Sequence, residues 1–244
     1  MHILLILSLV VTEMATEIYT PALPILKDFF RTTEEAIQWT LSYNLLGIAL
    51  SSCFYGPLSD SYGRKKIMLV GMIIFLISTG LCACASDIWT LIFLRFLQGI
   101  GAGAAWVIAL AMVTDLYETE ESLTILSILG ISISVSPAIA PIIGGVISVF
   151  WGWQMNFVVI GLAALILLIC LFIYLPETLP LSKRQPFSWN KLKENVSLLF
   201  HNKIFLGYTL ISGGMFAALW AFIARSPFVL NFLGVSQFYF GFYI

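Results

Sequence analysis

Seven long apolar stretches limit what this 244-residue chain can fold into. Each approaches or exceeds the roughly 20 residues that an α-helix needs to cross the hydrocarbon core of a bilayer. The chain is 60% hydrophobic and 10% charged, whereas ordinary soluble domains are about 25% charged. A water-soluble fold is therefore excluded, and we predict an all-α integral membrane protein. The predicted spans are Ile3–Pro24, Ile37–Tyr55, Ile67–Ala85, Ile88–Val113, Leu123–Phe150, Trp153–Leu175 and Ile204–Arg225.

The first span is interpreted as a retained helix rather than a cleaved signal peptide. It has no basic region before it, it contains Glu13 and Glu17, and it lacks a small-residue cleavage site. An eighth apolar segment begins near Gln237 and reaches only Ile244, which is too short to span.

A polar stretch, Pro176–Asn202, separates the first six spans from the rest. It contains three prolines, several basic residues and an amphipathic piece, Trp189–Phe200. We therefore predict three parts: a six-helix bundle over residues 1–175, a cytoplasmic basic linker over 176–203, and the start of a second bundle over 204–244. The rest of that second bundle is expected to be missing from this chain. The alternative is a protein built as an oligomer of short chains.

The distribution of basic residues predicts the orientation. With the N-terminus inside, the cytoplasmic loops hold eight Lys and Arg residues and the outer loops hold three, which satisfies the rule that basic loops stay in the cytoplasm. One predicted cytoplasmic loop is acidic and contains Asp115, Glu118, Glu120 and Glu121. Carboxylates count little in this rule. We expect a multi-pass protein of the cytoplasmic (inner) membrane.

The first span carries one polar stripe on an apolar helix: Thr12, Glu13, Thr16, Glu17 and Thr20. A carboxylate inside a membrane normally faces a cavity or a partner. Glu13 and Glu17 lie four residues apart on one face and repel each other when both are ionised, which favours protonation of one. A proton carrier needs this property. The alternative is that one of them forms an ion pair that only holds helices together.

Between the second and third spans lies Gly56–Lys66, which we interpret as a short cationic turn. Its glycines and Pro57 would let two helix ends approach closely. Asp60 is expected to pair with Arg64 or to cap the next helix. The pattern G-x-L-x-D-x-x-G-R-K-x resembles the cytoplasmic signature of the major facilitator superfamily. The resemblance implies a conformational gating role for Gly56, Asp60, Gly63, Arg64 and Lys65.

Further motifs resemble the drug:proton antiporters of the Bcr/CflA subfamily. The segment Glu17–Pro24 resembles D-x-Y-x-P-A-L-P, with Glu in place of Asp, and Leu94–Gly103 resembles R-x-x-Q-G-x-G. Ala140–Gly145 resembles G-P-x-x-G-G, with Ala in place of the first Gly, and later elements match at Arg225–Leu230 and Gly234–Ser236. Together the similarities run in order from Glu17 to Gly241.

The resemblance implies a major facilitator fold: the six-helix N-terminal half plus the first one or two helices of the C-terminal half. It implies proton-coupled efflux of drugs or other small amphipathic compounds, with a conformational role for Pro141, Gly144 and Gly145. The partners would be that substrate, protons and the lipid bilayer. Gly99 and Gly103 are expected to serve helix packing.

Arg95 lies far inside a span and must point inward. From matched depth in the membrane, we expect it to approach Glu17 and to share the proton-coupling role with both glutamates. A substrate cavity is expected to include Tyr19, Tyr43, Gln98 and Trp106. Trp39, Phe216 and Trp220 are weaker candidates, since each aromatic can instead pack in the core or face lipid.

Several functions are disfavoured. The sequence has no phosphate-binding glycine loop, no metal constellation and no nucleophile–base arrangement. Cys82 and Cys84 lack the companions of a zinc site. We therefore expect no cofactor, no metal, no nucleic-acid partner and no catalytic residue. Two alternatives to drug efflux stay open: transport of a small metabolite in the same fold, and a structural or receptor-like membrane protein. A membrane enzyme is a remote third.

Overall fold

The computed structural model describes residues 1–240, without the side chains of Lys191, Asn195, Gln237 and Phe238. Gly241 and the rest of the predicted eighth segment up to Ile244 lie outside the described residues. Every regular element in the described part is a helix. These are α1 (His2–Glu17), η1 (Thr20–Ala22), α2 (Leu23–Phe30), α3 (Glu34–Tyr62), α4 (Arg64–Cys82), α5 (Ile88–Leu116), α6 (Thr119–Trp151), α7 (Gln154–Tyr174), η2 (Leu181–Lys183), α8 (Trp189–His201), α9 (Lys203–Phe232) and α10 (Gln237–Phe240).

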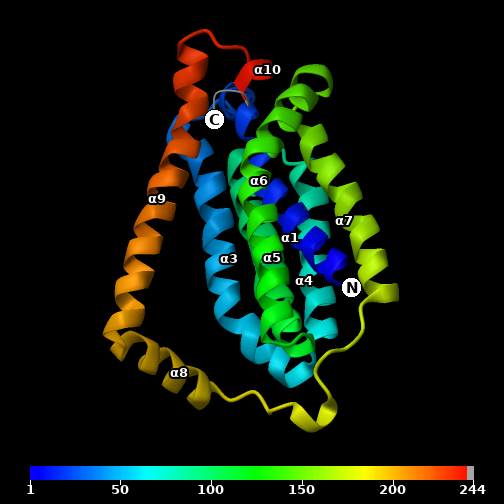
Figure 1. Ribbon diagram of the computed structural model, residues 1–244. Coiled ribbons are helices and arrows are strands. Elements are labelled where there is room, and N and C mark those ends of the chain that lie inside the picture. Colours follow the sequence, from blue (N-terminus) through cyan, green and yellow to red (C-terminus); the bar gives the residue numbers. More distant parts are fainter. Residues whose placement is uncertain (241–244) are drawn as a thin grey trace.

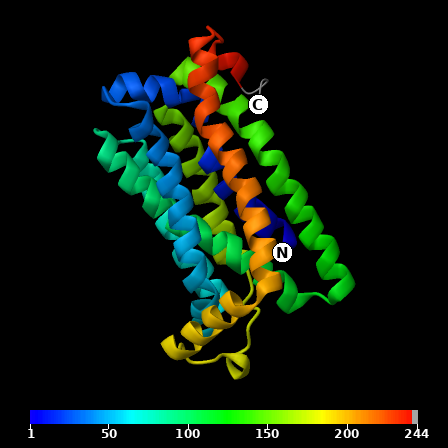
Figure 2. The ribbon, with the colours of Figure 1, turned by 90° about the vertical axis from the view of Figure 1, so that its left-hand side faces the viewer.

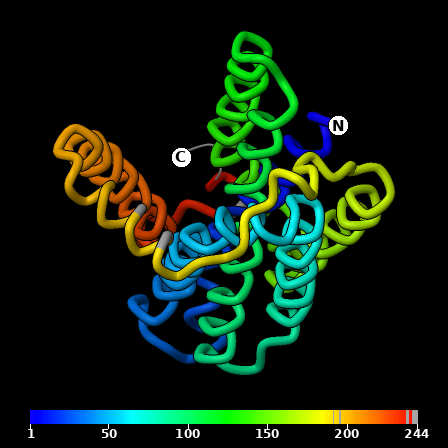
Figure 3. Tube along the Cα trace, turned by 90° about the horizontal axis from the view of Figure 1, so that it is seen from below, coloured from blue at the N-terminus to red at the C-terminus, as the bar shows by residue number. Residues whose placement is uncertain are grey.

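The long helices α1 and α3–α7 form one bundle, with α5 in contact with α1, α3, α4 and α6 (Figure 1). Helix α9 runs along the side of the bundle, and α8 crosses below the helix ends (Figures 1 and 2). Seen from below, α7 and α9 lie on opposite sides of the bundle (Figure 3). The buried residues of α9 are Ile223, Ser226, Pro227 and Phe228, so this helix packs at the end that lies beside α2.

Six described stretches are long and apolar enough to cross a membrane: His2–Phe30, Arg64–Cys82, Ile88–Leu116, Thr119–Trp151, Gln154–Tyr174 and Lys203–Phe232. Six of the seven predicted spans are therefore confirmed. The second predicted span, Ile37–Tyr55, lies within α3. This helix has 29 residues and is long enough to cross a membrane, but its mean hydropathy is too low for it to count among these six stretches. The polar side chains of Thr40, Asn44 and Ser51 lower its hydropathy, yet it runs the length of the bundle beside α5 (Figures 1 and 2).

The first span is not one continuous helix, contrary to the prediction. Helix α1 ends at Glu17, and a short 3-10 turn separates it from α2. Proline explains this break because it has no backbone N–H to donate. Pro21 cannot bond the carbonyl of Glu17, and Pro24 cannot bond that of Thr20. The chain therefore changes direction inside the apolar segment.

The predicted turn Gly56–Lys66 is much shorter than expected. Helix α3 continues through Pro57 to Tyr62, and α4 begins at Arg64. Only Gly63 separates the two helices, with φ at +99°. That backbone conformation suits glycine because a Cβ atom would be strained there. Pro57 is thus tolerated inside α3, and the two helix ends meet at Gly63 instead of at Pro57.

Glycines allow α5 to approach two neighbours closely, as predicted for Gly99 and Gly103. A Cβ at Gly99 would collide with the backbone carbonyl of Asn44 on α3, and one at Gly103 would collide with the Ser51 side chain. On another face of α5, Gly101 lies against the backbone of Phe75 on α4. These contacts place the polar residues of α3 and α5 next to each other in the bundle.

Candidate functional site

A cavity of about 380 Å³ lies between α1, α6 and α9. The two acidic side chains of the α1 stripe face it, and apolar and aromatic side chains from α6 and α9 complete its wall. Its lining residues are Glu13, Glu17, Ile133, Ser134, Pro137, Ala138, Phe216, Leu219, Trp220, Phe222 and Ile223. Phe216 and Trp220 were weaker candidates from the sequence. The remaining wall residues carry no local signal, because their position depends on how α6 and α9 pack.

Glu13 and Glu17 are almost entirely buried, with 9% and 2% of their surface exposed. Within residues 1–240, neither carboxylate takes part in an ion pair. Oε2 of Glu17 is buried without a hydrogen-bond partner. An ionised carboxylate inside a membrane is costly unless it is paired or solvated. The structure thus offers no ion pair of the kind that a purely structural role would use.

Arg95 is fully buried and lies against α1. One guanidinium nitrogen donates to the Ala15 carbonyl at 3.0 Å, and another donates to the Thr16 carbonyl at 3.3 Å. These carbonyls belong to the last turn of α1, where helix carbonyls lack intrahelical partners. Arg95 therefore caps the C-terminus of α1, where a cation also suits the helix dipole. Arg95 was expected to approach Glu17. Its guanidinium reaches the helix that carries Glu17 but bonds the backbone of that helix, and no Arg95–Glu17 ion pair is present in the described structure.

A buried polar network surrounds Arg95 and ties four helices together. Arg95 donates to Oε1 of Gln98, whose amide donates to Thr79 on α4 at 2.8 Å. The Tyr19 ring stacks on the guanidinium at 4.5 Å, and its hydroxyl bonds Thr40 on α3 at 2.8 Å. Two further members, Thr16 and Asn44, bond each other at 3.1 Å, and Asn44 donates to the Arg95 carbonyl at 2.9 Å. It was not predicted from the sequence that Thr40, Asn44 and Thr79 take part in this network. Their polar side chains within apolar spans could have indicated it.

The four residues predicted to line the substrate cavity lie outside the cavity that holds the glutamates. Tyr19 and Gln98 belong to the buried network. Tyr43 is exposed on α3, with its ring 6.5 Å from that of Phe96. Trp106 is half-buried and packs against the main apolar core.

A charged cluster joins the α3–α4 turn to the end of α5. Arg64 bonds Asp60 at 2.7 Å, Asp115 at 2.9 Å and the Ser59 hydroxyl at 2.6 Å. The structure therefore contains the expected Asp60–Arg64 pair. It also shows that α5 extends to Leu116, so Asp115 is helical and does not belong to the acidic loop as predicted. Its role was missed because Arg64 and Asp115 are 51 positions apart.

Glu177, from the segment after α7, completes this cluster. Its Oε1 accepts the backbone N–H of Arg64 at 2.9 Å, and its Oε2 pairs with Arg184 at 3.3 Å. A side chain at Gly63 would collide with both Glu177 and Arg184, so glycine is required there for space as well as for φ. Gly56 has no such crowding. The linker thus closes over the α3–α4 turn.

The other predicted gating residues make separate contacts. Lys65 donates to the Phe172 carbonyl on α7 at 2.9 Å. Pro141, Gly144 and Gly145 are buried in α6, which continues through Pro141 as a helix. A Cβ at Gly144 would collide with the carbonyl of Ile18, just after the end of α1. The small residue lets α6 cross the interruption of the first span.

At the opposite end of the bundle, Glu34 joins three helices. It pairs with Lys27 of α2 at 3.0 Å and with Arg225 of α9 at 3.7 Å. This contact was not predicted from the sequence. It lies beside the buried end of α9 and helps hold that end against the bundle.

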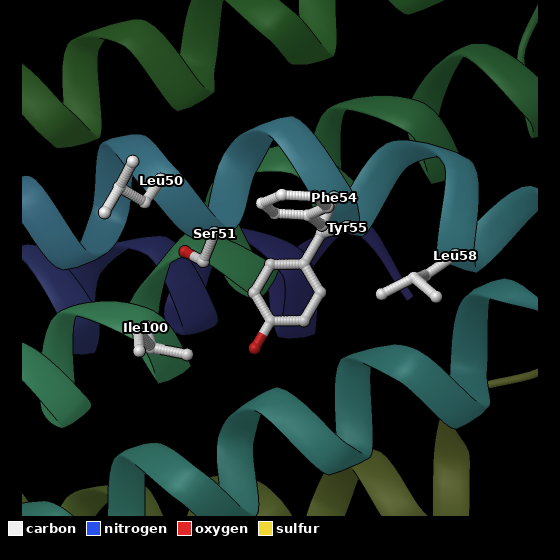
Figure 4. A pocket seen from close by; sticks show the side chains of 6 residues that line it. All are labelled: Leu50, Ser51, Phe54, Tyr55, Leu58 and Ile100. Atoms are coloured by element: carbon white, nitrogen blue, oxygen red, sulfur yellow. The ribbon is translucent and has the colours of Figure 1, made fainter. Parts of the chain in front are cut away.

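A second cavity, of about 260 Å³, lies between α3 and α5. Figure 4 shows its lining: Leu50, Ser51, Phe54, Tyr55, Leu58 and Ile100. It contains no carboxylate and no basic side chain. Its chemistry therefore does not suit proton exchange, in contrast to the glutamate cavity.

The sequence pattern of the Major Facilitator Superfamily matches residues 5–244. The chain belongs to the major facilitator superfamily. Within this superfamily, it is 32% identical to multidrug resistance protein D of Escherichia coli (strain K12), over 96% of this chain and 59% of that protein. It is also 32% identical to the bicyclomycin resistance protein homolog of Haemophilus influenzae, over 93% of this chain and 57% of the relative.

These relatives confirm the resemblance to Bcr/CflA-type proteins, and the chain spans less than two thirds of their length. Solved structures confirm the major facilitator fold. A bacterial homologue of the human lysosomal transporter Spinster, inward-facing and occupied, matches with a TM-score of 0.76 at 19% identity, over 98% of this chain and 56% of that one. A D-xylose–proton symporter matches with a TM-score of 0.72 at 16% identity, over 99% of this chain and 63% of the symporter chain.

Proposed function

We propose that the protein containing this chain exports drugs or other small amphipathic compounds across the cytoplasmic membrane in exchange for protons. The observation that carries the proposal is the pair of buried carboxylates, Glu13 and Glu17, that face one cavity without an ion-pair partner in the described residues. The names of the relatives, which refer to multidrug and bicyclomycin resistance, support the choice of substrate.

The cavity combines the two properties that such an exchange needs. Glu13 and Glu17 can hold a proton, because a neutral carboxyl group is far less costly than an ionised one inside the membrane. Phe216 and Trp220 on the opposite wall offer flat apolar surface to an amphipathic compound. Proton and substrate would occupy one cavity, so that loading of one favours release of the other. The proposal assigns no catalytic reaction to the chain.

We further infer the division into a bundle over 1–175, a linker over 176–203 and the first part of a second bundle over 204–244. The long polar linker and the one-ended packing of α9 support it. With the N-terminus inside, the Arg64 cluster lies at the cytoplasmic end and the Lys27–Glu34–Arg225 contact at the outer end. Rocking of two bundles around a central site requires contacts between the bundles that open and close, and the Glu34–Arg225 pair is such a contact between the first bundle and α9.

Drug susceptibility tests the proposal most simply. The gene would be read to its natural stop codon and expressed in a drug-sensitive bacterial strain lacking its own exporters. Wild-type protein should raise the inhibitory drug concentration, and Glu17→Gln should abolish the gain at equal expression. Glu121→Gln, an exposed glutamate on α6, serves as the matched control. Equal resistance from the Glu17→Gln and Glu121→Gln variants would contradict the role of the cavity.

A further inference from the structure

Helix α8 is held at the membrane surface by its place in the chain. It crosses below the ends of the bundle helices (Figures 1 and 2). Only Asn202 separates it from α9, which is long and apolar enough to span a bilayer. A helix whose last residue lies that close to a span cannot leave the interfacial region.

One face of α8 is apolar. At about 100° per residue, five of its large apolar side chains, Trp189, Leu192, Val196, Leu199 and Phe200, fall within a sector of about 100°, whereas the exposed Leu198 lies outside this sector, toward the opposite side of the helix. The Trp189 ring packs on Phe54 of α3 at 6.0 Å, which turns this face toward the bundle ends. Farther along, Val196, Leu199 and Phe200 are 38%, 44% and 68% exposed. The apolar face thus continues beyond its protein contact.

The same segment concentrates positive charge. Residues 183–203 contain five of the twelve Lys and Arg residues but one of the thirteen acidic residues. Lys193 follows the apolar sector on the helical wheel, and Lys203 is the first residue of α9, two positions after the end of α8. Both are exposed, and neither forms an ion pair with a described residue. Cations without an ion-pair partner among the described residues, next to an exposed apolar face, complement a bilayer surface, which has anionic headgroups and an apolar interior.

We propose that α8 lies on the cytoplasmic leaflet, with its apolar face among the acyl chains and Lys193 and Lys203 on anionic lipid headgroups. Amphipathic helices with basic polar faces bind membrane interfaces in this way. Each Lys close to an anionic leaflet adds electrostatic attraction that acts within a Debye length. Because Trp189 of α8 also packs on Phe54 of the bundle, lipid bound to α8 would restrict the motion of the segment that connects the bundle to α9.

Hydrogen exchange in nanodiscs tests this proposal. The gene product, read to its stop codon, would be placed in phosphatidylcholine alone or with phosphatidylglycerol added. Amides of Trp189–His201 should exchange about tenfold more slowly with phosphatidylglycerol present. Lys193→Gln with Lys203→Gln should remove that difference. Arg31→Gln, which removes an exposed cation at the other end of the bundle without breaking an ion pair among the described residues, should keep it.

Four outcomes would overturn the proposal. The first is equal exchange of α8 in both bilayers, which would mean that protein, such as the second half of a transporter, covers the apolar face. The second is a normal response to phosphatidylglycerol in the Lys193→Gln, Lys203→Gln variant. The third is the same slowing by soluble glycerol phosphate added to phosphatidylcholine nanodiscs, which would mark a free-anion site. Val196→Ser with Phe200→Ser should speed exchange in both bilayers, and unchanged exchange would also contradict insertion.

Discussion

Arg64 donates through Nε to Oδ2 of Asp115 at 2.9 Å, and this bond ties the start of α4 to the end of α5. The Arg64 side chain is 9% exposed, that of Asp115 is 23% exposed, and that of Asp60, the second partner, is 53% exposed. The two carboxylates therefore contribute unequally, because ion pairs in contact with water are weakened by solvent screening.

Asp115→Asn should destabilise the protein more than Asp60→Asn does. Loss of Asp115 leaves a buried guanidinium with its more exposed partner and should cost about 1–3 kcal/mol. Loss of Asp60 should cost less than about 1 kcal/mol. Thermal unfolding in detergent, followed by tryptophan fluorescence, measures both. A larger loss for Asp60→Asn would contradict the ranking.

Gly144→Ala and Gly130→Ala form a matched pair on α6. A Cβ at Gly144 would collide with the Ile18 carbonyl, whereas nothing lies near one at Gly130. Gly144→Ala should cost about 1–3 kcal/mol through overpacking, and Gly130→Ala should add about 0.4–1 kcal/mol of stability by restricting the unfolded chain. Unfolding midpoints that shift in the same direction would show that α1 and α6 do not approach this closely.

Arg95→Met should lower stability by roughly 3 kcal/mol. It removes the donors to the carbonyls of Ala15 and Thr16 and leaves these acceptors buried and unpaired. Arg31→Met makes the same chemical change at an exposed position and should have little effect. The yield of folded protein after mild heating, measured by size-exclusion chromatography, compares them. A stable Arg95→Met protein would mean that the cap on α1 is dispensable.

Asp87 should make the start of α5 sensitive to acid. Hydrogen bonds from the side chain and backbone of Thr90 hold the pKa of the Asp87 carboxyl below its usual value. Its contribution to stability is thus complete above the pKa of the unfolded carboxyl and is lost as the pH falls through the lower folded pKa. The unfolding midpoint should drop less with acid in Asp87→Asn, since Asn caps a helix without titrating. An identical slope in both proteins would exclude this role.

Much of the fold follows from local patterns. The length of the apolar stretches locates the six confirmed spans, and glycine spacing indicates the close approach of α5 to α3. The linker helix, predicted as Trp189–Phe200, is observed as α8, because its amphipathic pattern repeats within four turns. The Asp60–Arg64 pair was predictable for the same reason, since the two residues lie one turn apart.

Contacts between distant residues were not predictable in this way. Nothing local marks Asp115 or Glu177 as a partner of Arg64, and the matched depth of Arg95 and Glu17 does not decide which group the guanidinium bonds. The broken end of α1 offers carbonyl acceptors, and these take the cation instead of the carboxylate. The part of the cavity wall that α6 and α9 supply was also not predictable, because it depends on how these two helices, which are distant in the sequence, pack around α1.

Proton movement in inside-out membrane vesicles tests the central claim most directly. The gene product, read to its stop codon, would be expressed, and the vesicle lumen acidified by respiration. With wild-type protein or Glu121→Gln, addition of a transported drug should raise the luminal pH as protons leave in exchange. With Glu17→Gln, the initial rate should fall at least tenfold, and Glu13→Gln shows whether the second carboxylate shares the task. An undiminished drug-induced proton flux in the Glu17→Gln variant would contradict the account.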